Sequence, residues 1–284
     1  MSAPSVRRRR LGAELRTLRE RAGQKLDDIA RQIGHGYDGP RLSRVERGQL
    51  GIKPDALNAL LDAYSVEDVA KRDLLLALAR DGARRGWWQT YRDIISPAYA
   101  ELISLEADAK SLRSYQTQLI TGLLQTASYA RATMSAINPT STAEEVEALV
   151  QVRMGRQAVL TRPAPLEVWA ILHEAALHPK LGPRVMRDQL RHLLDLMDIP
   201  SVAIQILPLD APPHPGMSGP FTVLGFPESA DLDVVLVEHL ASALYVENAA
   251  DVSVYGSAFE HLRAHALPFD ASADLIATLM KDLK

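Results

Sequence analysis

The chain has 284 residues, of which 47% are hydrophobic and 24% charged, a composition typical of a folded globular protein rather than a disordered one. Its formal net charge is −3, and it contains no cysteine, which excludes disulfides, thiolate zinc sites and cysteine nucleophiles. No apolar run approaches the ~20 residues of a membrane span, and no apolar segment follows the basic residues 7–10 as it would in a secretory signal. We therefore expect a cytoplasmic protein without membrane contacts, long enough for two domains.

The charge is unevenly distributed along the chain. Residues 1–50 contain 12 Lys or Arg against 6 Asp or Glu, a local balance of +6. The remaining residues then contain 20 basic and 29 acidic side chains, a balance of −9. A basic N-terminal part on an acidic remainder is expected where only the N-terminal part meets a polyanion such as DNA.

Apolar residues repeat at helical spacing through the first 85 positions. Leu11, Leu15 and Leu18 fall on one face of a first helix, which Gly23 ends. Pro40 suits the first turn of a later helix, because its missing N–H would be unpaired there anyway. In chain order, the spacing predicts helices over residues 7–22, 25–34, 40–48, 53–64 and 67–85. A glycine-containing turn, "HGYDG", joins the second helix to the third, which is typical of a helix-turn-helix arrangement.

The segments "LDDIARQIG", "LSRVERG" and "LNALLDAY" carry a resemblance to a known family. They resemble the lambda-repressor and Cro-like regulators of the xenobiotic-response-element type, in which the third helix enters the major groove of double-stranded DNA. The resemblance implies that Glu46 is structural, paired with Arg16 or Arg19 of the first helix or capping a neighbour. It implies base-facing sites at Gly39, Pro40 and Arg44, phosphate contacts at Arg41, Ser43, Arg47, Gln49 and Lys53, and a further phosphate contact at Lys25, where the second helix opens.

The chain departs from that family's pattern at the turn and at the start of the third helix. The turn is about two residues longer than the common form, and Gly39 and Pro40 have no side chain that can donate to a base edge. Arg44 is then the main candidate for a bidentate contact to guanine. Tyr37 and His35 either pack the longer turn or contact the DNA.

The basic residues 7–10 lie at the start of the first predicted helix of the DNA-binding domain. We expect them to follow the DNA backbone or to enter the adjacent minor groove, as N-terminal arms do.

An aromatic cluster follows the helical N-terminal segment. Gly82 and Gly86 loosen the chain, and Trp87, Trp88 and Tyr91 come directly after them. These aromatic side chains either pack into the next domain or shape a ligand pocket. We predict a helix-turn-helix domain at 1–82, a linker with an aromatic anchor at 83–97, and a second domain at 98–284.

The second domain is predicted to be α+β, with helices flanking a small antiparallel or mixed sheet. Residues 98–136 and 142–162 have helical spacing, and Thr142 and Glu145 have the form of a capping box. Beyond Pro163 the period changes to short runs of strand-forming residues between Pro and Gly. These runs predict strands within 166–177, 201–209, 219–227 and 233–240, and the remaining helices are predicted at 183–197, 252–266 and 272–283.

The second domain also carries a resemblance, over about residues 90–280. The motifs "GLLQTASYARA", "VRMGRQAVLTRP", "LPLDAPPHPGMSGPFTVLGFP" and "VVLVEHL" resemble the uncharacterised regulatory domain found behind a helix-turn-helix in many regulators of high-GC filamentous bacteria. Thr121 stands where that family usually has proline. The resemblance implies a transcriptional regulator encoded beside a small partner protein, in a pair sometimes described as antitoxin-like. It implies no ligand, cofactor or catalytic residue.

The segment "HEAALH" invites an enzymatic interpretation, but its spacing argues against one. A zinc protease helix places two histidines at i and i+4, whereas His173 and His178 are five residues apart and so point in different directions on a helix. Arg153 and Arg156 either receive an anion or form surface salt bridges with Glu147 and Glu106. The Pro/Gly-rich loop at 211–220 is a candidate lid or docking loop for a partner.

Two functional hypotheses follow from these patterns. The first is a homodimeric, sequence-specific DNA-binding regulator whose second domain dimerises and senses a protein partner or small ligand, without catalytic activity, metal or cofactor. The second is an antitoxin-like interaction module that sequesters a small partner protein.

Overall fold

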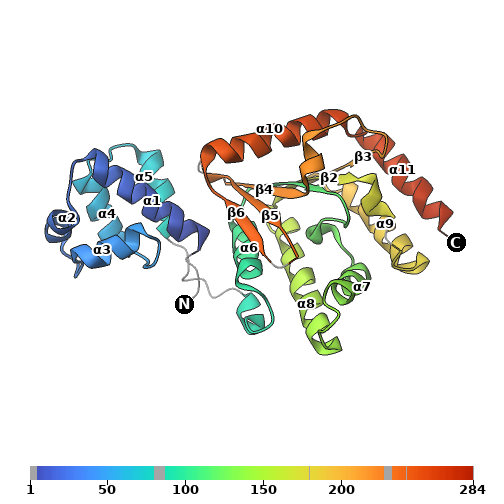
Figure 1. Ribbon diagram of the computed structural model, residues 1–284, viewed down its shortest axis with the longest axis horizontal. Coiled ribbons are helices and arrows are strands. Elements are labelled where there is room, and N and C mark those ends of the chain that lie inside the picture. Colours follow the sequence, from blue (N-terminus) through green and yellow to red (C-terminus); the bar gives the residue numbers. More distant parts are fainter. Residues whose placement is uncertain (1–4, 80–86, 179, 227–231, 241, 284) are drawn as a thin grey trace. The chain divides into compact units, whose positions relative to one another are not determined.

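The computed structural model describes residues 5–79, 87–178, 180–226, 232–240 and 242–283 (Figure 1). The chain divides into two compact units, Met1–Trp87, here called the head, and Trp88–Lys284, here called the body. The division falls inside the connecting segment that the sequence predicts at 83–97. The predicted end of the fifth helix at residue 85 and the predicted domain limit at residue 82 lie outside the described residues.

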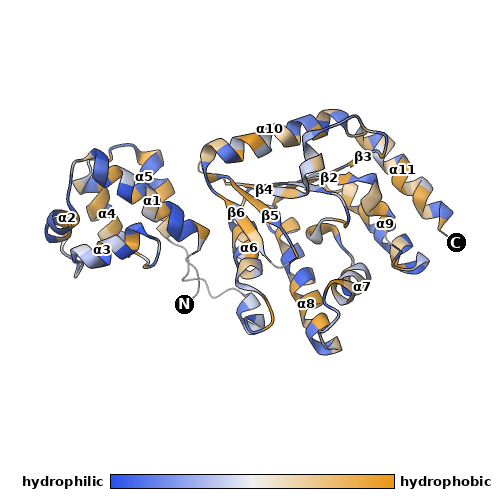
Figure 2. Ribbon diagram, viewed as in Figure 1, coloured by the Kyte–Doolittle hydropathy of each residue, from blue (hydrophilic) through white to orange (hydrophobic). Residues whose placement is uncertain are grey.

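The head is helical throughout its described length, as the apolar spacing predicts. Each helix buries one face, with Leu15, Ile29, Leu42 and Leu57 among the most buried side chains. Figure 2 shows that α1 nevertheless begins with strongly hydrophilic residues. The helices of the head are α1 (Val6–Arg21), α2 (Leu26–Ile33), α3 (Gly39–Glu46), α4 (Pro54–Ala63) and α5 (Val69–Ala79).

The basic residues 7–10 lie in the first turns of α1, as the helix predicted over residues 7–22 requires. Their contact with the DNA backbone or the minor groove stays a prediction. Ser5 caps this helix, and its side chain accepts a hydrogen bond from the backbone N–H of Arg8 at 3.4 Å. This capped start holds the arginines in helical geometry.

Helix α1 holds α3 through a backbone contact that requires glycine on both sides. A β-carbon at Gly12 would lie 2.5 Å from the carbonyl oxygen of Glu46, and one at Gly48 would lie 2.9 Å from the Cα of Arg9. Gly48 also has a left-handed φ of +70°, which glycine adopts without strain. The two glycines therefore let the helices approach more closely than any side chain would allow.

An ion pair reinforces the same contact between α1 and α3. Arg19 donates from Nε and Nη2 to the two carboxylate oxygens of Glu46 at 2.6 and 2.9 Å, and from Nη1 to the carbonyl of Gln24 at 3.0 Å. Both side chains are largely buried. The structural role predicted for Glu46 is confirmed with Arg19 as its partner, whereas Arg16 pairs with Glu20 on the surface at 2.8 Å.

The body contains a mixed sheet built from six strands of the described residues, in the order β3-β2-β1-β4-β5-β6. The three strands β1, β2 and β3 run parallel, and β4, β5 and β6 continue the sheet with antiparallel pairs. This confirms the predicted α+β domain with a small mixed sheet. The strands are β1 (Ser111–Gln116), β2 (Glu167–His173), β3 (Val202–Leu207), β4 (Phe221–Gly225), β5 (Val234–Glu238) and β6 (Ala243–Val246).

Helices cover both faces of this sheet. In Figure 1, α10 lies along one face, and α6, α8 and α9 lie on the other. Tyr115, Phe221 and Phe259 form part of the core under α10, and Figure 2 shows β4 and β5 in the colours of hydrophobic residues. The helices are α6 (Pro97–Asp108), α7 (Ala127–Ile137), α8 (Ala143–Arg156), α9 (Pro183–Met197), α10 (Ala249–His265) and α11 (Phe269–Asp282).

The helical segment predicted over residues 98–136 is wrong in part, because it contains a strand as well as the interruption near Gly122. The segment forms α6, then strand β1, then a short 3-10 helix at Gly122–Leu124, and then α7. The strand "SLRSYQ" has no β-branched residue, so its sequence does not favour a strand. It becomes one because β2 and β4 pair with it on both sides. The predicted capping box of α8 is confirmed, since Thr142 and Glu145 exchange hydrogen bonds with each other's backbone.

Two of the three aromatic residues of the anchor predicted within 83–97 pack on the body. Trp88 and Tyr91 are packed against a cluster that includes Ile95, Ile103 and Val152. Trp87 remains exposed. The packing role predicted for this cluster is therefore confirmed for Trp88 and Tyr91.

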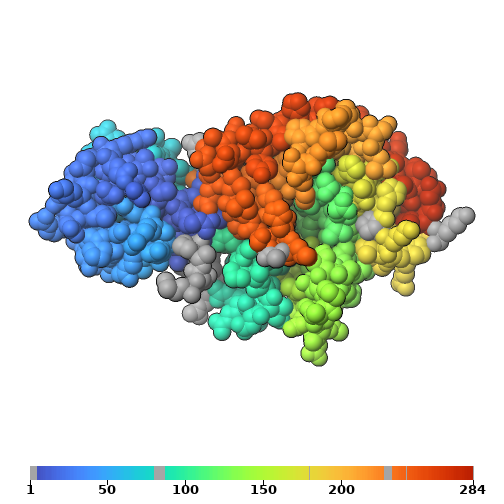
Figure 3. Space-filling view, in the orientation of Figure 1, coloured from blue at the N-terminus to red at the C-terminus, as the bar shows by residue number. Residues whose placement is uncertain are grey.

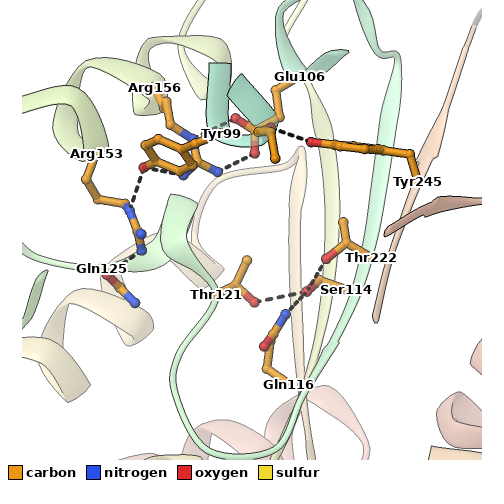
Figure 4. A network of polar contacts seen from close by, with 11 residues as sticks. Tyr99, Glu106, Ser114, Gln116, Thr121, Gln125, Arg153, Arg156, Thr222 and Tyr245 are labelled. Atoms are coloured by element: carbon orange, nitrogen blue, oxygen red, sulfur yellow. Dashed lines mark hydrogen bonds and ion pairs between the residues drawn. The ribbon is translucent and has the colours of Figure 1, made fainter. Parts of the chain in front are cut away.

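A buried polar network joins α6 to α8 in the body (Figure 4). Arg156 donates to both carboxylate oxygens of Glu106 at 2.5 and 2.8 Å, and these side chains are only 5% and 2% exposed. The Oη of Tyr99 accepts from Nη1 of Arg156 at 2.7 Å and from Nε of Arg153 at 3.0 Å. The predicted partner Glu106 is confirmed, but the predicted surface salt bridging is wrong, because Arg156 is buried and Glu147 pairs with Arg131 instead.

The two guanidinium groups change the acidity of Tyr99. Burial of the side chain raises the pKa of its phenol, but the charges of Arg156 and Arg153 and their hydrogen bonds lower it by more. The pKa of Tyr99 therefore lies below its ordinary value of 10.0. The phenolate contributes stability that is fully present above the pKa of the unfolded chain and is lost as the pH falls through the pKa of the folded chain.

Breaking the ion pair between Arg19 and Glu46 is expected to destabilise the head. Arg19→Met keeps the aliphatic stem but leaves the Glu46 carboxylate without its partner, and we expect a loss of roughly 2–3 kcal/mol, below the ~3–5 kcal/mol of fully buried pairs. Urea unfolding of the full chain, followed by circular dichroism, measures the change. Arg16→Met is the control, because that exposed pair contributes little. Equal destabilisation by both variants would contradict the role given to Arg19.

The network in the body predicts one tyrosine that ionises early. In an ultraviolet titration of the folded chain, we expect one phenol to ionise below pH 10, and Tyr99→Phe should remove this step. Tyr115→Phe is the control, because burial raises the pKa of Tyr115 to about 12 and its loss should leave the early step unchanged. Persistence of the early step in Tyr99→Phe would show that the guanidinium groups do not act on this phenol.

Candidate nucleic-acid interface

Helix α3 has a buried face and an exposed face at helical spacing. Leu42 and Val45 are buried in the head, whereas Pro40, Arg44 and Arg47 are exposed on the other side of the helix. Asp38 fixes the start of the helix, since its side chain accepts a hydrogen bond from the backbone N–H of Arg41 at 2.7 Å. The result is a short, capped helix that presents one row of exposed residues.

The turn before α3 is held by Tyr37. Its ring lies beneath the guanidinium of Arg41, 4.5 Å from the ring centroid, and its Oη accepts from the backbone N–H of Lys53 at 3.4 Å. Tyr37 itself is buried, so it packs the turn rather than facing outward to DNA. His35 is exposed, and it has a left-handed φ of 51° between two glycines with the same handedness.

Arg44 is the arginine of α3 without an internal partner. Arg41 donates from Nη1 to the carbonyl of Gly36 at 2.9 Å, and Arg47 donates from Nε to the carbonyl of Ser43 at 3.2 Å. Across the part of the chain that the structure describes, the guanidinium of Arg44 makes no hydrogen bond or ion pair. Its five donors are thus available for an external acceptor.

The structure also locates the predicted phosphate contacts around α3. Lys25 and Lys53 are the N-cap residues of α2 and α4, and both side chains are exposed. Gln49 is exposed just beyond the end of α3, and Ser43 is half-buried. Lys25, Gln49 and Lys53 are therefore exposed donors next to the ends of α2, α3 and α4.

Gly39 does not take the base-facing position predicted for it. The residue is buried, and a β-carbon there would lie 1.9 Å from Oδ1 of Asp27 in α2. The side chain of Asp27 occupies the place of a β-carbon at Gly39, so a larger residue there would have to displace that carboxylate. Pro40, the next residue, is exposed but cannot donate a hydrogen bond. Arg44 is therefore the residue among the three predicted base-facing positions that can read a base edge by hydrogen bonds.

The "HEAALH" segment forms a strand end and a 3-10 helix. His173 is the last residue of β2, and its Nδ1 accepts from the backbone N–H of Ala175 at 3.2 Å. The 3-10 helix spans Glu174–Leu177, and Nε2 of His178 lies 3.7 Å from Oε1 of Glu174. The two histidines therefore do not share the face of an α-helix, and the described residues contain no group of three potential metal ligands.

The loop at 211–220, a predicted lid or docking loop, is anchored at its centre. A 3-10 helix at Pro215–Ser218 buries Gly216, where a β-carbon would lie 2.4 Å from the ring of Tyr115. The ring of His214 meets Tyr115 edge-on, with 6.1 Å between centroids. The loop is therefore packed on the body through these residues, and Met217 is the large apolar side chain that it exposes.

Comparisons with known proteins agree with this division of the chain. A model of a helix-turn-helix domain matches residues 10–75, which contain α2, the turn and α3. A search of curated proteins and of solved structures found no match to the chain. Among the described residues, no helix is both long enough and apolar enough to cross a membrane.

The helix-turn-helix match and the exposed face of α3 make the head a DNA-binding domain of the kind found in transcription regulators. A second family model, of a domain of unknown function (DUF5753), matches residues 99–278, which is more than half of the chain and most of the body. The chain therefore belongs to the family that is defined by this domain of unknown function.

Proposed function

We propose that the protein is a sequence-specific transcriptional regulator of the lambda-repressor-like type that acts in the cytoplasm. The observation that carries the proposal is the exposed face of α3, where Arg44 has no internal partner and sits between Pro40 and Arg47. A guanidinium held on the exposed face of the third helix is suited to the O6 and N7 acceptors of guanine in the major groove.

The remaining exposed donors around α3 suit the phosphate backbone. Lys25, Arg47, Gln49 and Lys53 lie at helix starts and ends, where side chains reach the flanks of a groove rather than its floor. With a single donor side chain for the bases, the head depends on DNA shape and on the spacing of half-sites for the rest of its specificity.

The body serves regulation rather than catalysis in this proposal. It dimerises the protein, which places two heads on paired half-sites about 34 Å apart, and it senses a protein partner or a small ligand. No cofactor or metal takes part. An antitoxin-like role, in which the body sequesters a small protein encoded nearby, is the alternative outcome of the binding test below.

Two single substitutions separate base recognition from phosphate contact. Arg44→Ala should cost roughly 1–3 kcal/mol on an operator with guanine at the contacted position and should relax the base preference there. Lys53→Ala should weaken binding to all sequences and reduce the slope of log K against log salt by about 1. Fluorescence anisotropy with the upstream region of the gene, at several salt concentrations, measures both.

The structure supplies controls for this comparison. Tyr37 accepts a hydrogen bond from the backbone N–H of Lys53, not from its side chain, so Lys53→Ala keeps this bond in the turn. Arg16→Ala removes an exposed arginine of α1 and should leave both affinity and preference unchanged. Equal loss of base preference in Arg44→Ala and Lys53→Ala would contradict the division of roles. Absence of DNA binding, together with a stable complex with the neighbouring gene product, would favour sequestration.

A further inference from the structure

The two edges of the body sheet differ in how their backbone groups are covered. At the β3 edge, the backbone N–H of Ile206 donates to the hydroxyl of Ser272 at 3.0 Å, and its carbonyl accepts from the N–H of Leu267 at 2.8 Å. Helix α11 also packs on β3 and so covers this edge. At the β6 edge, no strand of the described residues pairs beyond β6. An open edge offers unpaired backbone groups to another strand.

The hairpin geometry shows which groups of β6 point outward. His239 and Ser242 exchange backbone hydrogen bonds at 2.8 and 3.4 Å, so they form a hydrogen-bonded pair. In an antiparallel ladder such pairs alternate with non-bonded ones. With the register Glu238↔Ala243, Val237↔Leu244 and Leu236↔Tyr245, Leu244 bonds to β5. The N–H and C=O groups of Ala243 and Tyr245 therefore point to the open edge.

The side chains of this hairpin are unusually apolar for an open edge. Leu244 is 56% exposed and Leu240 is 92% exposed. Leu244 points to the same sheet face as Val246, which packs on the core under α10. Charged residues and proline on an edge strand keep the sheets of monomeric proteins from pairing. Residues 243–246 contain neither. In Figure 3 the orange segment that includes β6 lies at the surface of the body.

We propose that β6 is the dimer interface and that it pairs antiparallel with β6 of a second copy of this chain. The two-fold axis passes between the Leu244 residues of the two protomers. Ala243 of each protomer then forms a hydrogen-bonded pair with Tyr245 of the partner subunit. The two sheets then join into one. This proposal deepens the proposed function, because binding to paired half-sites needs two heads.

Three features make a second copy the occupant that fits this edge. An antiparallel register centred on one residue is self-complementary, since each protomer supplies the same two outward donors and acceptors. The strand carries no charge, so the pairing brings no like charges opposite each other. Tyr245 is already held by a hydrogen bond from its Oη to the carbonyl of Ala98 at 2.7 Å, which fixes the edge before a partner arrives.

The pairing also covers apolar surface that the single chain exposes. The two Leu244 side chains lie directly opposite in a non-hydrogen-bonded pair, where Cα atoms are about 4.5 Å apart. A two-fold axis perpendicular to the sheet puts both α10 helices on the same face.

Cysteine cross-linking tests the register directly, because the chain contains no cysteine. In Leu244→Cys the two new thiols lie opposite each other at a Cα separation that a disulfide can span, and mild oxidation should convert nearly all of the protein to covalent dimer. Leu240→Cys is the matched control. It is more exposed, but it lies in the turn before β6, about three residue positions from the axis, so its two copies are roughly 20 Å apart and it should remain monomeric on a denaturing gel.

A second variant tests the backbone bonds. Ala243→Pro removes an N–H that faces the open edge and leaves the ladder to β5 intact. We expect its dimer dissociation constant to rise by about ten-fold or more in analytical ultracentrifugation without DNA, with an unchanged circular dichroism spectrum. Unchanged dimerisation of Ala243→Pro, equal cross-linking of Leu240→Cys and Leu244→Cys, or a wild-type monomer at high concentration would each overturn the proposal.

The same samples distinguish failure of the interface from failure of the proposed function. A β6-linked dimer that does not bind the upstream DNA would leave the interface standing and reject the regulator. DNA binding by a wild-type chain that is monomeric in solution would keep the regulator and reject the interface.

Discussion

The close approach of α1 to α3 is the constraint on which the candidate DNA interface depends. Gly12 and Gly48 let the backbones meet at distances that no β-carbon would tolerate, and the pair between Arg19 and Glu46 ties the same helices by charge-assisted hydrogen bonds. A recognition helix of eight residues has little stability of its own. Its orientation must come from its neighbours, so the outer row that includes Arg44 is only as well placed as this contact.

The start of α3 shows how the same constraint limits readout. Gly39 is buried where α2 and α3 meet, and the Asp27 side chain fills the place of its β-carbon. Pro40 suits the first turn of a helix, which needs no N–H there. Both residues serve the construction of the helix. In the proposed function, base recognition therefore falls to Arg44, one turn further along α3, whereas Tyr37 and Arg41 hold the longer turn.

The parts that the sequence predicts well are those with local causes. Helical periodicity and capping residues locate the helices of the head, and β-branched runs between Pro and Gly locate β2, β3, β4 and β5. Strand β1 is missed because "SLRSYQ" has no strand-forming pattern and depends on pairing with β2 and β4. The burial of Arg156 is missed for a similar reason, since its partner Glu106 lies 50 residues away and only the packing of α6 on α8 brings them together.

In the candidate interface, too, the sequence predicts the features with local causes and misses those that depend on another helix. Exposure of Pro40, Arg44 and Arg47 follows from the period of α3, which the spacing of Leu42 and Val45 already contains. The burial of Gly39 does not follow from that period, because it comes from contact with Asp27 in another helix. A glycine at the start of a helix that must pack on its neighbour is a signal for such contacts, although sequence alone does not name the neighbour.

The single base-contacting side chain proposed for α3 and the open edge of β6 both bear on how the protein could reach specific DNA binding. A single guanidinium supplies discrimination of roughly 1–3 kcal/mol at one base pair, far below the ~4–10 kcal/mol that separates specific from non-specific binding. Doubling the contact through a two-fold dimer adds the contributions of two half-sites and imposes their spacing as a further criterion. A body that joins two copies through the edge of its sheet would thus provide specificity that α3 lacks, and any signal that changed the pairing at β6 would change DNA binding without touching the head.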